Sequence, residues 1–222
     1  LFSGLPKAVL AAIIIEAVVM GMMDVPEMRR LRRVARVDFW IAVAAILGVL
    51  GSGVLAGVMI GIALSVLWLI YISVTPLMQV LGRQPGTQVF RGVDDHPDYE
   101  TYPGLLVLRF DAGLFFASAD ALEERLIELY YAAEPKPHTV VLDFEGVNFV
   151  DSQGADKVAE LVELATARDI ELRLARVKTT VKDVLERDGI VDRLGESRIY
   201  GNVYEAAADR IPVEPVPQAD SD

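Results

Sequence analysis

Two apolar blocks occupy the first third of the chain. Residues 5–23 form a run of 19, with Lys7 near its start and Glu16 as the one charge further in. Residues 39–75 then supply 37 consecutive uncharged positions. A helix rises about 1.5 Å per residue and a bilayer core is about 30 Å thick. The first block therefore predicts one membrane span, and the second is long enough for two, folded as a helical hairpin that turns near residues 48–57.

Arginines indicate the orientation of these three spans. Five of them lie within residues 29–36, between the first span and the hairpin, and the turn near Gly51 has none. Because short arginine-rich loops stay in the cytoplasm, everything after Pro76 is expected on the cytoplasmic side. Alternatively, residues 29–36 form an amphipathic helix that binds anionic lipid. Topology alone accounts for the arginines and is the favoured interpretation.

Glu16 is a candidate functional residue, because an acid inside a membrane span is costly and often takes part in ion coupling. The sequence leaves two interpretations open. Glu16 couples proton movement to transport, or it faces a protein interior or a water-filled crevice without transporting anything. The second interpretation is favoured.

The rest of the chain alternates strand and helix patterns, which is typical of one α/β domain. We expect residues 1–80 to be membrane spans, 81–103 a linker, 104–212 the α/β domain and 213–222 a disordered tail. A hairpin of two short strands is predicted around Asp111–Gly113, and Asp120 is expected to cap the first helix. Further elements are expected in this order: strand 138–150, helix 152–169, strand 170–177, a helix from 179 that stops near Asp188–Gly189, strand 198–201 and helix 203–211.

Charge and composition exclude several classes of function. Residues 1–80 carry a net charge of +2, and the remaining 142 residues carry −13. Such an acidic domain repels phosphate backbones, so nucleic acid is not an expected partner. The chain has no cysteine and two histidines, His96 and His138, both beside prolines, so we expect no disulfide, metal site or cofactor. No nucleophile–base–acid set can be assembled, and the protein is not expected to be an enzyme.

The first residue is Leu1, and the apolar run after it lacks a basic segment and a small-residue cleavage site. A signal peptide is therefore not favoured. We expect the chain to be the C-terminal piece of a longer protein.

The stretch NFVDSQGAD, residues 148–156, places polar residues where a strand meets a helix. Unpaired N–H groups and the positive end of the helix dipole lie at such a point. Asp151 or Ser152 can cap the helix, and Gly154 permits a turn or a close approach. In the alternative interpretation, Ser152 is a regulatory phosphorylation site, since a phosphate gains from the same dipole. Capping is favoured.

Several ordered motifs resemble one known family. VLDFEGVNFVDSQGADKVAEL is similar to the signature of STAS domains, which sulfate transporters and anti-sigma factor antagonists share. The other motifs resemble the SulP sulfate permease family, in which a membrane domain precedes a cytoplasmic STAS domain. They are LPKAVLAAIIIEAV, ARVDFWIAVAAILGVL, LGRQPGTQVF and GLLVLRFDAGLFFASADALEERL.

The resemblance implies a fold and a site. It implies three membrane spans followed by an α/β STAS domain with a mixed β-sheet flanked by helices. In the antagonists, the serine after the conserved aspartate is phosphorylated by a partner kinase, and Ser152 takes that position here. Gln153 stands where the family usually has Ser or Thr, which argues against recognition by such a kinase.

It also implies a function. SulP proteins resemble fourteen-span anion transporters with a core and a gate, and the three spans here match the last three, in the gate. The substrate site lies in earlier spans, so no substrate-binding residue is carried over. The expected protein is a multi-pass, homodimeric secondary active transporter in the cell membrane. Its partners are the lipid bilayer, an inorganic anion such as sulfate and a regulatory protein on the STAS domain. The alternative is a membrane-tethered STAS signalling module, acting as a phospho-switch or nucleotide sensor.

Overall fold

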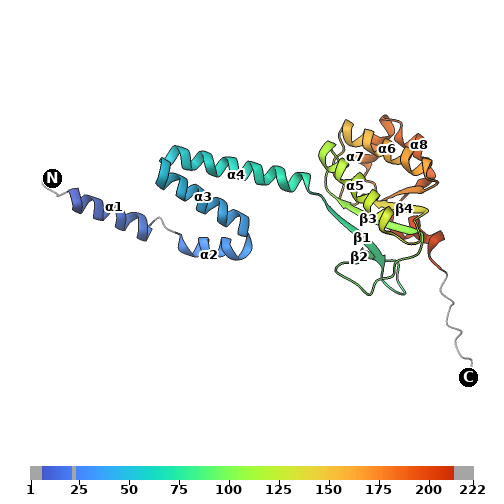
Figure 1. Ribbon diagram of the computed structural model, residues 1–222, viewed down its shortest axis with the longest axis horizontal. Coiled ribbons are helices and arrows are strands. Elements are labelled where there is room, and N and C mark those ends of the chain that lie inside the picture. The colour runs from blue at the N-terminus through green and yellow to red at the C-terminus, as the bar shows by residue number, and fades with distance from the viewer. Residues whose placement is uncertain (1–6, 22–23, 213–222) are drawn as a thin grey trace, which may run out of the picture. The chain divides into compact units, whose positions relative to one another are not determined.

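The computed structural model describes residues 7–21 and 24–212. The chain divides into two compact units, Leu1–Ile70 and Tyr71–Asp222, and Figure 1 labels most of their helices and strands. The tail 213–222 lies outside the described residues, and its disorder stays a prediction.

The first unit is helical. By length and composition, α4 is the one helix in the described ranges that could cross a membrane. The first helix is shorter in its described part, and α3 carries Arg36 and Asp38 in its first turn. The structure therefore supports one of the three expected spans directly, and the other two stay predictions. The bounds are α1 Lys7–Gly21, α2 Val25–Val34, α3 Arg36–Ser52 and α4 Val54–Val74.

A single residue, Gly53, joins α3 to α4, inside the stretch where the glycines predicted a turn. Its φ of +91° lies in a region that side chains with a Cβ rarely adopt, so glycine is required for this reversal. The expected turn within residues 48–57 is confirmed.

The hairpin closes through backbone contact at Gly57, a buried residue of α4. A Cβ atom added to Gly57 would lie 2.5 Å from Val49 N and 2.7 Å from Ala45 O. On the α3 side, a Cβ on Gly48 would lie 3.0 Å from Gly57 Cα. Small residues thus let the two helices approach at backbone distance, which is how helices associate in lipid, where no hydrophobic force holds them together.

We predict that Gly57→Leu forces α3 and α4 apart, because the new side chain would overlap backbone atoms. Overpacking of this kind costs about 1–3 kcal/mol or more. The matched control is Gly51→Leu, since a Cβ on Gly51 meets nothing within 4 Å. Thermal unfolding of the detergent-solubilised full-length protein should show a lower midpoint for Gly57→Leu alone. Equal midpoints for the two variants would contradict the close crossing.

The second unit is built on a six-stranded sheet in the order β2-β1-β3-β4-β5-β6. The first strand pairs antiparallel with β2 and β3, while β3, β4, β5 and β6 run parallel, so the sheet is mixed as expected. The strands are β1 Leu77–Arg83, β2 Phe90–Gly92, β3 Leu105–Asp111, β4 Thr139–Asp143, β5 Glu171–Ala175 and β6 Ile199–Tyr200.

Helices cover both faces of this sheet. Alternating strand residues divide the core: Leu106 and Leu142 pack with the helices α5–α8, and Val107 and Val141 pack with α9. This alternation follows from the two-residue repeat of a strand. The helices are α5 Phe116–Ala132, α6 Ser152–Ala167, α7 Thr179–Arg187, α8 Ile190–Leu194 and α9 Val203–Ala207, with single 3-10 turns at Glu196–Arg198 and Ala208–Arg210.

The segment expected to be a linker, 81–103, differs from that expectation. It contains the second half of β1 and all of β2, and Arg83 and Glu100 form a further antiparallel bridge. Its turn-forming residues fall in the connections between these pairings. The sheet therefore begins at Leu77, well before the expected start of the α/β domain at residue 104.

The predicted hairpin around Asp111–Gly113 is wrong. After β3 ends at Asp111, Leu114 makes one isolated bridge with Val150, and α5 begins at Phe116. Asp120 is accordingly not a cap and lies inside α5. Ser118 secures the start instead: its hydroxyl accepts the Phe115 N–H at 3.0 Å and donates to Gly113 O at 2.7 Å. The sequence did not predict this helix start, because the apolar pair Phe115–Phe116 fits the pattern of a strand.

Candidate functional site at the carboxyl edge of the parallel strands

The parallel strands end at one edge of the sheet, where α6 begins. Arg109 of β3 lies opposite Asp143 of β4, and Asp143 lies opposite Ala175 of β5. Because parallel strands point the same way, the residues that follow them collect at this edge. In α/β folds this is where functional groups usually lie.

Asp151 is the N-cap of α6. Its Oδ1 accepts the Gly154 N–H at 2.7 Å, and its backbone carbonyl accepts the Ala155 N–H at 2.9 Å. Ser152 is the first residue of the helix and is exposed, and its side chain makes no hydrogen bond to the part of the chain that the structure describes. Of the two capping candidates, Asp151 takes the role, which leaves the Ser152 hydroxyl to solvent.

Gly154 is required by a close backbone approach. A Cβ at this position would lie 2.2 Å from Leu114 O and 2.7 Å from Leu114 C. The same carbonyl accepts the Asp151 N–H at 3.1 Å, and Leu114 N–H donates to Phe149 O at 2.7 Å. The connection from β3 to α5 is thus fastened to the start of α6 by backbone hydrogen bonds.

We predict that Gly154→Ala lowers the free energy of unfolding by about 1–3 kcal/mol, because the methyl group must displace the Leu114 backbone. Gly113→Ala is the matched control, since a Cβ there meets atoms no nearer than 3.8 Å. Urea unfolding followed by circular dichroism measures both. A Gly154→Ala midpoint equal to that of the control would overturn this account of the junction.

A buried carboxylate organises the same edge. The Asp143 side chain is 0% exposed. Its Oδ2 accepts a hydrogen bond from Arg109 Nε, and its Oδ1 accepts one from Arg176 Nε, both at 2.8 Å. Arg176 Nη2 also donates to Oδ2, and the Glu145 N–H donates to Oδ1 at 3.2 Å. Both guanidinium groups reach the exposed Glu145 carboxylate, at 3.3 Å and 2.7 Å. The buried charge is therefore fully paired.

Sequence reasoning missed this cluster. Asp143 ends a buried strand, and its partners stand 34 and 33 residues away along the chain. One feature of the sequence could have predicted the cluster. An acidic residue at the end of a buried apolar strand needs a basic partner, because an unpaired buried charge is very costly in free energy. Which arginines supply that partner depends on strand order and register, and no local pattern encodes those.

Asp111, at the end of β3, adds a second acid to this edge. Burial raises the pKa of Asp111, and the Asp143 and Glu145 charges raise it further, while Arg109 and Arg176 oppose the shift. Because its pKa is higher in the folded state, ionising Asp111 destabilises the fold. This destabilisation is absent below the unfolded pKa and complete once the pH exceeds the folded pKa.

We predict that Asp143→Ala destabilises the second unit by about 3–5 kcal/mol, because it leaves two arginines without their buried partner. Glu145→Ala touches the same arginines from an exposed position and should cost no more than about 1 kcal/mol. Chemical denaturation of both variants provides the comparison. A small loss for Asp143→Ala would show that solvent replaces the buried carboxylate.

This edge combines an exposed serine hydroxyl at the start of α6 with a buried, fully paired carboxylate. A phosphate on Ser152 would gain from the helix dipole but would stand next to the Asp151 carboxylate, which repels it. Among the described residues, no three histidine or carboxylate side chains converge to hold a metal ion. Glu16, the other residue predicted to be functional, lies on α1 and is exposed.

Comparison with known proteins identifies the family. Residues 96–206 match the STAS domain family. The chain is 31% identical over 217 residues to sulfate transporter 4.1, chloroplastic, of Arabidopsis thaliana. This alignment covers 93% of this chain and 31% of that protein. It is 33% identical over 195 residues to a probable sulfate transporter of Mycobacterium tuberculosis, covering 88% of this chain and 35% of that protein.

The fold has a solved counterpart. The murine Slc26a9 anion transporter in its inward-facing state matches 93% of this chain and 34% of that chain, with a TM-score of 0.78 and 21% identity. The chain spans about a third of the length of the curated relatives it matches. The likeness to sulfate transporters continues through the helical unit, and the STAS match covers half of the chain, so this chain belongs to the STAS domain family.

Proposed function

We propose that this chain is the C-terminal part of a secondary active transporter that carries an inorganic anion, sulfate in the first instance, across the cell membrane. The observation that carries the proposal is the 31% identity with a sulfate transporter over 93% of the chain, through both units. In this proposal the substrate site lies in spans that precede this segment, as the family resemblance implies. The protein acts as a homodimer with its STAS domain in the cytoplasm.

The helical unit supports a gate role. We propose that α1, α3 and α4 are the last three spans, with α3 and α4 forming the hairpin that the arginines of residues 29–36 orient. The backbone contact at Gly48 and Gly57 favours movement of this hairpin as one rigid piece. A core carrying the anion then moves against the hairpin, while the STAS domain serves as the platform for assembly or for a regulatory protein.

Uptake by the full-length protein tests this proposal. Reconstituted vesicles should accumulate radiolabelled sulfate, and unlabelled sulfate should compete better than bicarbonate, chloride or a dicarboxylate. If one of the other anions competes best, sulfate is the wrong substrate. If no anion is accumulated under an imposed proton or sodium gradient, the transporter assignment fails.

The same vesicles test Glu16 as a coupling residue. If the carboxyl group of Glu16 exchanges the coupling proton, Glu16→Gln flattens the pH dependence of uptake, because an amide does not titrate. An unchanged pH profile would remove Glu16 from the coupling mechanism.

A second function has one observation in its favour: the exposed hydroxyl of Ser152 at the start of α6. In this alternative the STAS domain is a phospho-switch or nucleotide sensor tethered to the membrane. Two features oppose it. Gln153 stands where the antagonists usually have Ser or Thr, and the sequence contains no glycine-rich phosphate loop.

We predict equal uptake by Ser152→Ala, Ser152→Asp and the wild-type protein, because Asp151 supplies the cap in all three. Gln153→Asp is the matched control, since it adds one charge to the same exposed first turn. A change in uptake for Ser152→Asp that Gln153→Asp does not share would favour the phospho-switch.

A further inference from the structure

Most of the arginines that were expected to orient the membrane spans lie on a regular, capped helix, which membrane orientation alone does not require. The arginines between α1 and α3 lie on a separate helix, α2, which Asp24 caps by accepting the Glu27 N–H at 2.9 Å. Orientation by positive charge depends on the number of basic residues and needs no particular structure. A capped helix therefore calls for a second explanation.

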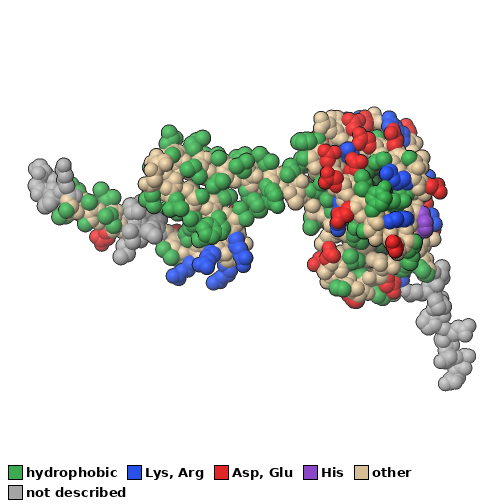
Figure 2. All heavy atoms as spheres, in the orientation of Figure 1, with side chains coloured by type: hydrophobic (Ala, Val, Ile, Leu, Met, Phe, Trp, Pro, Cys, Tyr) green, Lys and Arg blue, Asp and Glu red, His purple; other side chains and the backbone are tan. Residues whose placement is uncertain are grey.

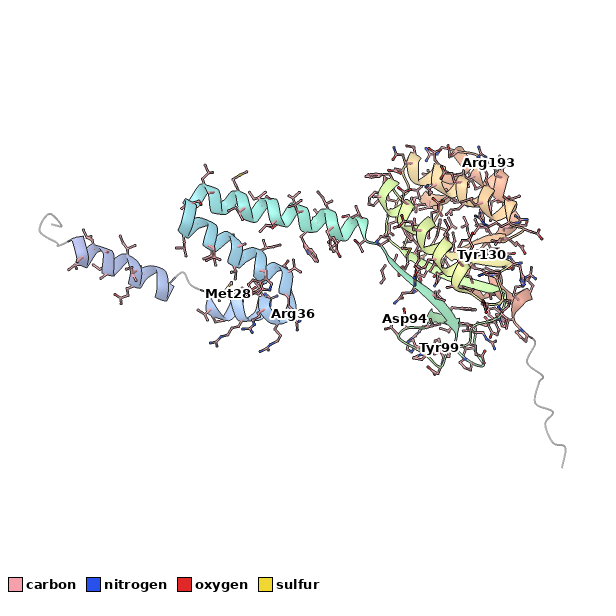
Figure 3. The ribbon with its side chains drawn as sticks, in the orientation of Figure 1. Met28, Arg36, Asp94, Tyr99, Tyr130 and Arg193 are labelled. Carbon is pink, nitrogen blue, oxygen red and sulfur yellow. The ribbon has the colours of Figure 1, made fainter. Side chains whose placement is uncertain are left out.

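The two sides of α2 differ in chemistry. With 3.6 residues per turn, Arg29 and Arg33 lie on one side of α2, and Met28 and Leu31 lie on the other. Arg32 lies at the border between the two sides, one turn after Met28. The three arginines are exposed, whereas Met28 and Leu31 are half-buried in the helical unit, in which α2 contacts α3. Figure 2 shows the basic side chains gathered on one surface of this unit, and Figure 3 labels Met28 on α2 and Arg36 at the start of α3.

These arginines have almost no protein counter-charge. Arg30 pairs with Glu27 at 2.7 Å, on the surface. Within the described residues, Arg29, Arg32 and Arg33 make no ion pair. A guanidinium group binds phosphate oxygens through two parallel N–H donors, so a row of unpaired arginines matches a layer of phosphate groups.

Apolar neighbours distinguish a lipid surface from a free anion. Val34, which ends α2, is 73% exposed, and Trp40, in the first turns of α3, is 66% exposed. Tryptophan collects at the level of lipid headgroups, and an interfacial helix inserts apolar side chains while its arginines extend to the phosphates. A site for free phosphate or sulfate does not require an exposed valine at the end of the arginine-bearing helix or an exposed tryptophan in the helix that follows it.

We propose that α2 lies in the inner membrane interface and binds the phosphate groups of anionic lipids through Arg29, Arg32 and Arg33. The proposal rests on the membrane topology given under the proposed function. Binding holds the junction between the first span and the hairpin at a fixed depth, and it makes the gate sensitive to the content of anionic lipid.

Lipid binding to the purified full-length protein tests the proposal without transport. Native mass spectrometry counts the phosphatidylglycerol and phosphatidylcholine molecules retained from mixed micelles. The test variant is Arg29→Gln/Arg32→Gln/Arg33→Gln. The matched control removes three exposed arginines of the second unit, Arg168→Gln/Arg187→Gln/Arg193→Gln, and a triple lysine variant keeps the charge of α2.

We expect the wild-type protein to prefer phosphatidylglycerol and the test variant to lose at least about tenfold of that preference, since each basic residue near an anionic surface contributes about fivefold. The control and lysine variants should keep most of the preference, and added salt should reduce it. The proposal is overturned if the test variant binds like the wild type. It is also overturned if inorganic phosphate displaces the lipid at equal concentration, which would indicate a free-anion site.

If the triple Arg→Gln variant cannot be produced as folded protein, a second measurement tests the same proposal. A polarity-sensitive fluorophore on Val34→Cys, with any cysteine outside this segment replaced by serine, should report a less polar environment when phosphatidylcholine nanodiscs are exchanged for a mixture with phosphatidylglycerol. No shift overturns the proposal. Absence of sulfate uptake counts against the proposed function alone, because neither readout depends on transport.

Discussion

The STAS unit depends on the contact between the backbone of Leu114 and the start of α6. Leu114 O accepts the Asp151 N–H, and its position leaves no room for a side chain at residue 154. This contact fixes where α6 leaves the sheet, and α6 in turn supplies much of the core on that face. Around it, Asp143 ties β3 to the segment after β5 through Arg109 and Arg176. A buried ion pair adds little net stability, but it penalises any arrangement that leaves the carboxylate alone.

The helical unit also relies on close backbone contact at glycine. At Gly57 and Gly48, as at Gly154, the absence of a Cβ lets two backbones meet. In water, apolar burial would bring such elements together; in lipid, close packing must do so. The hairpin of α3 and α4 is therefore specified by its small residues, and its surface is left apolar for contact with the bilayer or with other spans. This separation of roles suits a gate that keeps its own shape while a neighbouring core moves.

Charge divides the chain between its two environments. The helical unit concentrates arginines on α2, where anionic headgroups can neutralise them, and the second unit is strongly acidic and is repelled from the same surface. The described residues include no metal cluster, and the edge of the sheet offers a capped helix and a paired carboxylate. These features are compatible with the proposed role of the chain as a supporting segment of a transporter.

The sequence by itself determined the apolar blocks, the glycine turn of the hairpin, one strand within each of the ranges 138–150 and 170–177 and the helix from residue 152, because hydrophobic periodicity and turn residues act over a few positions. The first of these strands ends at Asp143, seven residues before its predicted end. The tertiary structure decided the pairing of β1 and β2 with the sheet, the choice of Asp151 over Ser152 as cap, the start of α5 at Phe116, and the partners of Asp143. The strand pairings and the partners of Asp143 depend on residues from distant parts of the chain. The Asp151 cap and the start of α5 are local contacts between which the residue types alone did not choose. Short-range sequence patterns do not predict the long-range contacts, because strand order and register are set only when the whole core is packed.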